Sequence, residues 1–234
     1  MADTIGGMTA AFAISSALAG RTMGNKNAKG SFIDISMLES VMATMGWVVS
    51  NYLIAGKEPA ANGNDNFTSS PSGAFATADG QLNIAANKQE QFEALCDVLG
   101  LESLITDPRF VSRKERLENR SALTALLEAV LVTKETDHWV EKLNVVGVPS
   151  GAVLTVPQAL ALPQIAERGM MASFENVPGA DRDIRILRTG IKMDGAAPSV
   201  NTPPPELGQD NQDVLSSLGF SRDEIDNLAK EGVL

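Results

Sequence analysis

The sequence predicts an α/β protein, and the beginning of the chain carries most of that prediction. Apolar residues recur at helical spacing over residues 4–22 and again over residues 37–54. A polar turn over residues 24–30 and a run of strand-forming side chains over residues 32–36 separate these two segments. A helix, a strand and a second helix in that order are typical of a layered α/β domain. The first helix is apolar on two neighbouring stripes, so we expect it to be covered on most sides.

The middle of the chain predicts a loop followed by a smaller unit of strands and helices. Residues 56–73 are rich in proline, glycine and asparagine, which is typical of a linker or an active-site loop. Strands over residues 73–78 and 81–86 should follow, joined at Asp79-Gly80 in a hairpin. Helices are then expected at 89–99, 119–131 and 134–143, with Ser121 and either Thr133 or Thr136 as N-caps.

Shorter elements are predicted for the rest of the chain. Residues 148–153 read as an extended stretch, and Pro157 suits the first turn of a helix that ends near residue 162. We expect strands over 171–177 and 183–187, and helices over 212–218 and 222–230. The prolines between residues 198 and 205 should make a stiff, extended connection between these strands and these helices.

Composition favours a soluble protein inside the cell. The 234 residues are 44% hydrophobic and 21% charged, a balance typical of globular proteins with a buried core. Acidic residues number 29 and basic residues 19, so a net charge of −10 argues against a nucleic-acid partner. The apolar stretch at 8–20 is too short to span a membrane, and no basic cluster marks it as a secretory signal. The single cysteine fits a reducing cytoplasm.

Most familiar catalytic patterns are missing from the sequence. The single histidine, His138, has no further ligands at metal spacing and no nucleophile elbow to accompany it, so we expect a surface or packing role. Cys96 lies on the apolar face of a predicted helix, where a buried small side chain is favoured over a nucleophile. Neither a phosphate-binding loop nor a complete dinucleotide fingerprint is present, and we expect no metal site.

Asp3 stands directly before the first apolar helix and is a candidate nucleophile. An ionised aspartate near a helix N-terminus can attack an activated acyl group. Gly6 and Gly7 follow it, and their lack of side chains would let a bulky ligand approach the backbone. From these residues alone, a simple N-cap aspartate is the favoured alternative.

Several short segments together resemble the family III CoA-transferases, also called the CaiB/BaiF family. Each segment is weak evidence alone, but all occur in the family's order along nearly the whole chain. They are residues 2–8 around Asp3, 28–39, 74–80 (Ala-Phe-Ala-Thr-Ala-Asp-Gly), 107–110 (Asp-Pro-Arg-Phe), 146–151 and 205–209. The resemblance implies part of a large doubly wound, Rossmann-like domain together with a smaller α+β domain. It assigns residues 1–55 and 168–234 to the large domain, and 56–167 to the linker and small domain.

The resemblance also implies a mechanism. The family's aspartate, here Asp3, attacks the thioester of a donor acyl-CoA to give a mixed anhydride, and the released CoA then forms an aspartyl-CoA thioester. A carboxylic acid acceptor regenerates an anhydride, from which CoA takes the new acyl group. Coenzyme A is thus a substrate, with no permanently bound cofactor. Met37 should lie near CoA together with Gly6 and Gly7, while the loop at 64–73 should close over the active site with the following residues: Ser69, Ser70, Ser72 and Gly73.

Two departures from the family keep alternatives open. Known formyl-CoA transferases have a run of glycines where this chain has serines, which argues against oxalate or formate as the substrate. The related 2-methylacyl-CoA racemases have a glutamate about where Gln89 falls, and an amide cannot serve as that acid. A racemase of the same fold and a non-catalytic assembly remnant are therefore the alternatives to a CoA-transferase.

The family places a nucleotide-binding half ahead of the catalytic aspartate, whereas this chain begins two residues before Asp3. We therefore expect a truncated chain that is inactive alone, or one that a partner completes. Family members are interlocked homodimers, which the resemblance implies for the full-length protein. The apolar helices at the start would also let the shorter chain self-associate.

Overall fold

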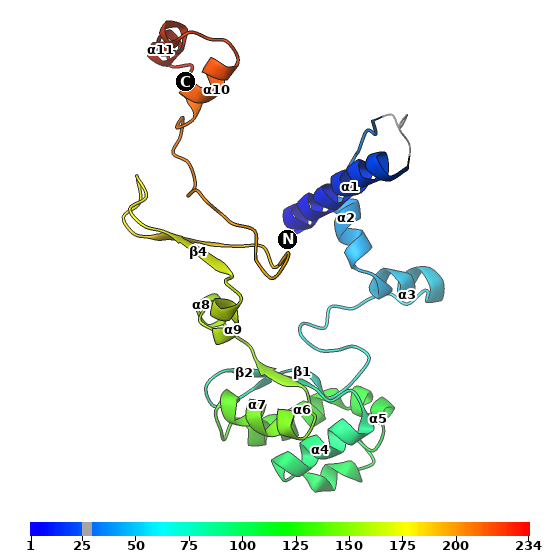
Figure 1. Ribbon diagram of the computed structural model, residues 1–234. Coiled ribbons are helices and arrows are strands. Elements are labelled where there is room, and N and C mark those ends of the chain that lie inside the picture. The colour runs from blue at the N-terminus through cyan, green and yellow to red at the C-terminus, as the bar shows by residue number, and fades with distance from the viewer. Residues whose placement is uncertain (25–29) are drawn as a thin grey trace.

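The computed structural model describes residues 1–24 and 30–234. Most of the polar turn expected over residues 24–30, and the first two residues of the segment at 28–39, lie outside this description. Figure 1 shows one compact unit in the middle of the chain, with an N-terminal arm of helices and a C-terminal arm extending from it.

The N-terminal arm contains three helices: α1 (Ala2–Gly24), α2 (Met37–Thr44) and α3 (Trp47–Ala55). The helix predicted over 4–22 is confirmed. The single helix predicted over 37–54 is wrong, because Gly46 has a φ of 50° and a ψ of −117°, a backbone conformation that interrupts a right-handed helix. The strand predicted over 32–36 is also wrong, since these residues have no regular secondary structure. A strand needs a hydrogen-bonded neighbour, and no strand in the described ranges pairs with this segment.

Much of the apolar surface of the N-terminal arm is exposed. Met8 and Phe12 of α1 are 70% and 75% exposed, and Leu53 of α3 is 73% exposed. Helix α1 packs against α2, yet this contact leaves its apolar stripes open. The expectation that the first helix is covered on most sides is therefore wrong for the chain taken alone. Exposed apolar patches of this kind are typical of interaction surfaces.

The compact unit, residues 72–152, is called the central unit here. Its antiparallel sheet consists of β1 (Ser72–Ala76), β2 (Gln81–Ala85) and β3 (Ser150–Ala152), with β2 in the middle. Below this sheet in Figure 1 lie α4 (Gln89–Leu99), the 3₁₀ turn η1 (Glu102–Ile105), α5 (Arg113–Glu118), α6 (Arg120–Leu131) and α7 (Thr136–Val145). The predicted hairpin and the predicted helix at 89–99 are confirmed, and the helices expected at 119–131 and 134–143 form with slightly different ends.

The core of the central unit lies between its sheet and its helices. Alternate strand residues face the helices, and Phe75, Leu82 and Ile84 are each at most 2% exposed. Helix α6 presents a leucine every fourth residue to this core, and all of them are fully buried: Leu123, Leu127 and Leu131. Burying such a side chain contributes about 1.5–3 kcal/mol, so this core holds the central unit together.

A small polar cluster fixes the tip of the β1–β2 hairpin to α7. The Asp79 carboxylate accepts hydrogen bonds from the Thr136 backbone N–H and hydroxyl, both at 2.8 Å. The Thr77 and Thr136 hydroxyls lie 2.7 Å apart. The Thr136 N–H bond is the main reason why the pKa of Asp79 is lowered. The residues that precede α6 and α7 are Asn119 and Glu135, so the predicted N-caps are wrong.

The C-terminal arm consists of short elements. They are α8 (Val156–Leu160), α9 (Pro163–Glu167), β4 (Met171–Phe174), β5 (Ile184–Leu187), α10 (Asn211–Ser217) and α11 (Arg222–Lys230). Strands β4 and β5 form an antiparallel pair, shorter than predicted, and a capping box between Ser221 and Glu224 begins α11. The extended stretch predicted at 148–153, the two strands and the helices predicted after it are thus confirmed. The division into a large and a small domain at residues 55 and 167 stays a prediction.

Candidate active site

Asp3 lies in the first turn of α1, with its side chain exposed to solvent. The backbone N–H of Ile5 donates to the carbonyl of Met1 at 3.0 Å, so helical hydrogen bonding begins before Asp3. The N-cap alternative therefore does not hold, because a cap residue precedes the first helical residue. At this position the carboxylate interacts favourably with the helix dipole and remains open to a reactant.

Gly6 and Met37 bring α1 and α2 together beside Asp3. Gly6 follows Asp3 by three residues and therefore shares a helix face with it. It is buried, and a Cβ added to it would lie 3.1 Å from Met37 Cγ. Met37 is the first residue of α2 and is 54% exposed. By contrast, a Cβ on Gly7 would meet no atom within 4 Å, so Gly7 borders open space.

The start of α2, and with it Met37, is defined by local hydrogen bonds. The side chain of Ser36 accepts a bond from the Glu39 N–H at 3.3 Å, which makes Ser36 the N-cap. The hydroxyl of Ser40 returns a bond to the Ser36 carbonyl at 2.8 Å. These contacts place Met37 in the first helical turn, where its side chain reaches Gly6.

The loop at 64–73, called the serine loop here, is buried over residues 69–73, whereas Asn64, Asp65, Phe67 and Thr68 are exposed. Ser69, Ser70 and Ser72 are 2%, 1% and 5% exposed. The Ser69 hydroxyl donates to the carbonyl of Asn87 at 3.4 Å. A Cβ on Gly73 would overlap the carboxylate of Asp65, which explains why glycine stands there. The predicted loop residues thus form a packed edge of the sheet.

Three arginines that sequence reasoning missed bind the serine loop. They are Arg113 and Arg116 on α5, and Arg120 at the start of α6. Each donates to loop carbonyls, including those of Thr68 and Ser70 at 2.7 and 2.9 Å. Arg116 is 1% exposed, and burial lowers the pKa of its guanidinium. Arg113 and Arg116 are three residues apart and share a face of α5, but Arg120 begins the next helix, so no single helical pattern in the sequence groups all three.

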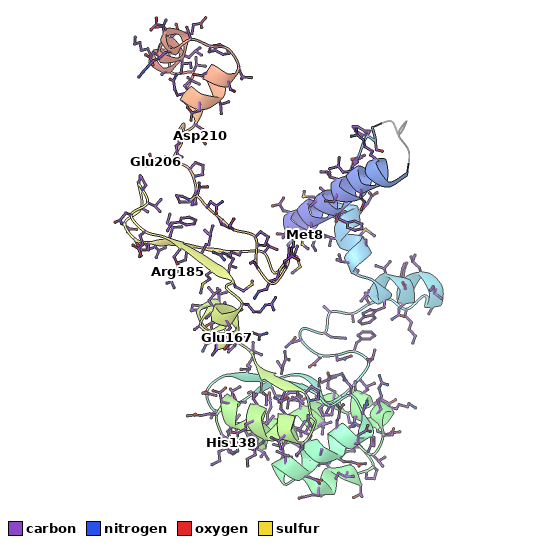
Figure 2. All side chains as sticks on the ribbon, in the orientation of Figure 1. Met8, His138, Glu167, Arg185, Glu206 and Asp210 are labelled. Atoms are coloured by element: carbon purple, nitrogen blue, oxygen red, sulfur yellow. The ribbon has the colours of Figure 1, made fainter. Side chains whose placement is uncertain are left out.

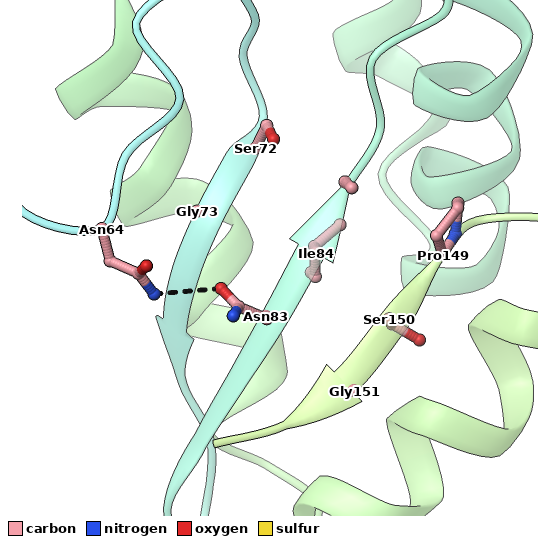
Figure 3. Close-up of a pocket in the computed structure, with 9 residues that line it drawn as sticks. Asn64, Ser72, Gly73, Asn83, Ile84, Pro149, Ser150 and Gly151 are labelled. Atoms are coloured by element: carbon pink, nitrogen blue, oxygen red, sulfur yellow. Dashed lines mark hydrogen bonds between the residues drawn. The ribbon is translucent and has the colours of Figure 1, made fainter. Parts of the chain in front are cut away.

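A cavity of about 400 Å³ opens beside the end of the serine loop. Figure 3 shows it on the sheet, with the side-chain amide of Asn64 donating to that of Asn83 at 3.0 Å. The lining residues are Asn64, Ser72, Gly73, Asn83, Ile84, Ala85, Pro149, Ser150 and Gly151. Two of the predicted loop residues, Ser72 and Gly73, therefore line this cavity although both are buried, whereas Ser69 and Ser70 lie outside the lining.

The structure does not bring Asp3 and the serine loop to one place. The N-terminus and the β1 strand lie apart in Figure 1, and Figure 2 likewise separates Met8 on α1 from His138 on α7. An aromatic pair nevertheless connects the two regions. The ring of Trp47 on α3 stacks on that of Phe67 in the serine loop, with centroids 4.0 Å apart and an interplanar angle of 17°. The loop is thereby attached to the arm that carries Asp3.

The remaining reactive side chains stay outside this arrangement. Cys96 is fully buried, and desolvation raises the pKa of its thiol to about 12, so the prediction of a buried side chain is confirmed. His138 is exposed and lies edge-on to Trp139. Over residues 1–24 and 30–234, no group of three or more histidine, cysteine or acidic side chains is arranged to hold a metal. No helix within the described residues is long and apolar enough to cross a membrane.

Comparison with known sequences decides the family. The profile of CoA-transferase family III matches residues 1–211, which is most of the chain. The chain belongs to CoA-transferase family III. A solved structure supports the α/β fold of this family: a CaiB/BaiF family protein from Brucella suis has a TM-score of 0.78 and 31% sequence identity. That match covers 93% of this chain and 55% of the Brucella protein.

Named relatives of this family III chain are CoA-transferases. An acetyl-CoA:oxalate CoA-transferase from Acetobacter aceti is 36% identical over 186 residues, 80% of this chain and 47% of that protein. A succinyl-CoA:glutarate CoA-transferase from Mus musculus is 30% identical over 227 residues, 97% of this chain and 52% of that protein. The chain thus spans about half the length of these relatives.

Proposed function

We propose that this chain is the part of an acyl-CoA:carboxylate CoA-transferase that carries the nucleophile, Asp3. The observation that carries the proposal is the exposed Asp3 carboxylate on the α1 face where Gly6 meets Met37. Its reach into solvent suits attack on a large thioester, and the bare backbone at Gly7 leaves room for one. The names of the relatives support thioester donors and carboxylic acid acceptors.

The reaction proceeds in four balanced displacements. An Asp3 oxygen attacks the thioester carbonyl of the donor, the C–S bond breaks, and a mixed anhydride and free CoA thiolate result. The thiolate attacks the aspartyl carbonyl and releases the donor's carboxylate. The acceptor carboxylate then displaces CoA thiolate from this aspartyl-CoA thioester. In the last step the thiolate attacks the acceptor's carbonyl, which gives the new acyl-CoA and regenerates the Asp3 carboxylate.

The other parts of the chain have supporting roles in this proposal. Met37, Gly6 and Gly7 would border the CoA thioester, and the serine loop, with Ser69, Ser70, Ser72 and Gly73, would cover the reacting end. Residues 1–55 and 168–234 would belong to the large domain and 56–167 to the small one. The complete protein would be an interlocked homodimer in the cytoplasm, with the exposed apolar faces of α1 and α3 buried in the assembly.

Turnover measurements test the proposal. The longest protein that the reading frame encodes is assayed with acetyl-CoA or succinyl-CoA and a panel of oxalate, glutarate and formate. Asp3→Asn should lower kcat by about a thousandfold or more, because removal of a covalent nucleophile removes the reaction path. Asp34→Asn, a change to an exposed carboxylate outside α1, serves as the control. Equal turnover in the parent and Asp3→Asn would contradict the proposal.

A second assay separates transfer from racemisation. The same protein is incubated with a 2-methylacyl-CoA in deuterated water, and deuterium at the α-carbon is measured. A CoA-transferase leaves that carbon unlabelled, because no step of the proposed path removes its proton. Rapid labelling without transfer to an acceptor would support the racemase alternative instead.

A further inference from the structure

We propose that Arg113, Arg116 and Arg120, named the arginine clamp here, are positioning residues that hold the serine loop so that Phe67 stacks on Trp47. The clamp would thereby keep the loop in one orientation relative to the arm that carries Asp3. The structural part of this inference rests on contacts alone. Its consequence for turnover rests on the proposed function.

The serine loop needs partners for its backbone because it has little regular secondary structure. A buried carbonyl without a hydrogen bond costs free energy, so partners must come from elsewhere in the chain. The clamp supplies most of them. Arg113 Nε donates to the carbonyl of Thr68 at 2.7 Å, and Arg116 Nε to that of Ser70 at 2.9 Å. The Arg120 guanidinium donates to the carbonyls of Ser72 at 3.2 Å, Ser69 at 2.9 Å, and Asn66.

Arg116 is the fixed centre of the clamp. Its Nη1 donates to the carbonyl of Phe110 and to the side chain of Gln89, both at 2.9 Å. Its guanidinium carbon lies 4.3 Å from the centroid of the Phe92 ring, within cation–π distance. An apolar side chain would fill this volume without the cost of burying a cation. What an apolar side chain cannot do is hold loop and core carbonyls at once, and this geometry is what the arginine provides.

The clamp forms hydrogen bonds with the backbone on both sides of Phe67. Arg120 holds the residue before it, Asn66, and Arg113 holds the residue after it, Thr68. The backbone N–H of Asn66 also donates to the carbonyl of Ser72 at 2.9 Å, which closes the segment into a ring. With both neighbours fixed, the side chain of Phe67 has a defined direction, and in that direction it meets Trp47.

Arg120 is the most informative position for a test. Its three loop contacts require a planar guanidinium with several donors, which a lysine ammonium cannot reproduce. Its side chain is 19% exposed and lies 3.7 Å from the Asp65 carboxylate, so substitution removes less core packing than at Arg116. Lys114 on α5 is the matched control, because it pairs with Glu118 at 3.8 Å and its side chain is 79% exposed.

Fluorine NMR of the 5-fluorotryptophan-labelled chain tests the structural part directly. The chain has two tryptophans, so Trp47 reports on the stack and buried Trp139 on the integrity of the core. Arg120→Gln and Arg120→Lys should shift the Trp47 resonance toward its position in Phe67→Ala, while Trp139 stays in place. Lys114→Gln should change neither resonance. An unshifted Trp47 resonance in both Arg120 variants would overturn the clamp.

Turnover of the longest encoded protein tests the positioning role. Arg120→Lys should lower kcat by about tenfold, the effect of losing hydrogen bonds to a charged group, while KM for the acyl-CoA changes less than twofold. A shifted Trp47 resonance with unchanged kcat would overturn the positioning role. No turnover in the parent protein would instead refute the proposed function. The fluorine measurement would still test the contacts between the arginine clamp and the serine loop.

Discussion

Gly6 of α1 and Met37 of α2 are packed so closely that a Cβ on Gly6 would lie 3.1 Å from Met37 Cγ. This contact joins the helix that carries Asp3 to the helix whose first residue is Met37. Ordinary side-chain contacts are wider, so any larger residue at position 6 must displace the methionine. The pair therefore determines how the two helices meet next to the candidate nucleophile.

Substitutions at neighbouring glycines separate packing from helix propensity. Leucine forms helices better than glycine by almost 1 kcal/mol, so Gly7→Leu, whose Cβ would meet no atom within 4 Å, should make α1 more stable. Gly6→Leu gains the same propensity but forces Met37 away, an overpacking that costs about 1–3 kcal/mol. Hydrogen exchange of the α1 and α2 amides measures both effects.

The expected result is slower exchange in Gly7→Leu and faster exchange at the start of α2 in Gly6→Leu. If Gly6→Leu protected α2 as well as the parent does, the contact between Gly6 and Met37 would not be what joins the helices.

Cys96 should be almost inert toward thiol reagents in the folded chain. Burial raises the pKa of its thiol from 9.0 to about 12, so at pH 8 the reactive thiolate is about a thousandfold rarer than for an ordinary thiol. Its full burial adds a steric barrier. Iodoacetamide should therefore modify Cys96 only after denaturation. Mass spectrometry measures this modification over time. Rapid modification of Cys96 in the native chain would show that α4 is not packed as described.

Asp79 should make the central unit sensitive to acid. The Thr136 N–H bond holds the folded-state pKa of Asp79 below its unfolded value of 3.8. Its contribution is therefore complete above the unfolded pKa and is lost as pH falls through the lower, folded pKa. Asp79→Asn should lower the melting temperature at pH 6, and the difference from the parent should shrink as pH falls below 3.8.

The control for this prediction is Asp97→Asn, because Asp97 is an exposed carboxylate on α4 in the same unit. A melting-temperature difference for Asp79→Asn that is constant between pH 2 and pH 6 would show that the ionised carboxylate does not hold the hairpin tip to α7.

Sequence reasoning succeeded where structure depends on neighbouring residues. Asp79-Gly80 between two strand-like segments predicted the hairpin, and the apolar stripe of α4 predicted its buried face, including Cys96. It failed at residues 32–36, because strand formation needs a pairing partner that propensity does not supply. It also missed the break at Gly46, since the apolar spacing continues across it.

The site was less accessible from the sequence than the fold. Asp3 became a candidate nucleophile through family resemblance, because an aspartate near a helix start is usually a cap. The arginine clamp was missed because charged residues on a short helix ordinarily face water. Only the tertiary fold brings Arg116 against Phe92 and the loop carbonyls. The spacing of residues in the sequence does not predict that this cation is buried.

Covalent trapping on Asp3 tests the central claim most directly. The longest encoded protein is incubated with an acyl-CoA, quenched with hydroxylamine and digested with trypsin, and the peptide ending at Arg21 is analysed by mass spectrometry. Fragment ions of this peptide locate the hydroxamate, and within residues 1–21 Asp3 is the only acidic side chain that can carry it. We predict that the parent protein yields this Asp3 hydroxamate and that Asp3→Asn yields none. An unmodified peptide from protein that is turning over acyl-CoA would contradict the account.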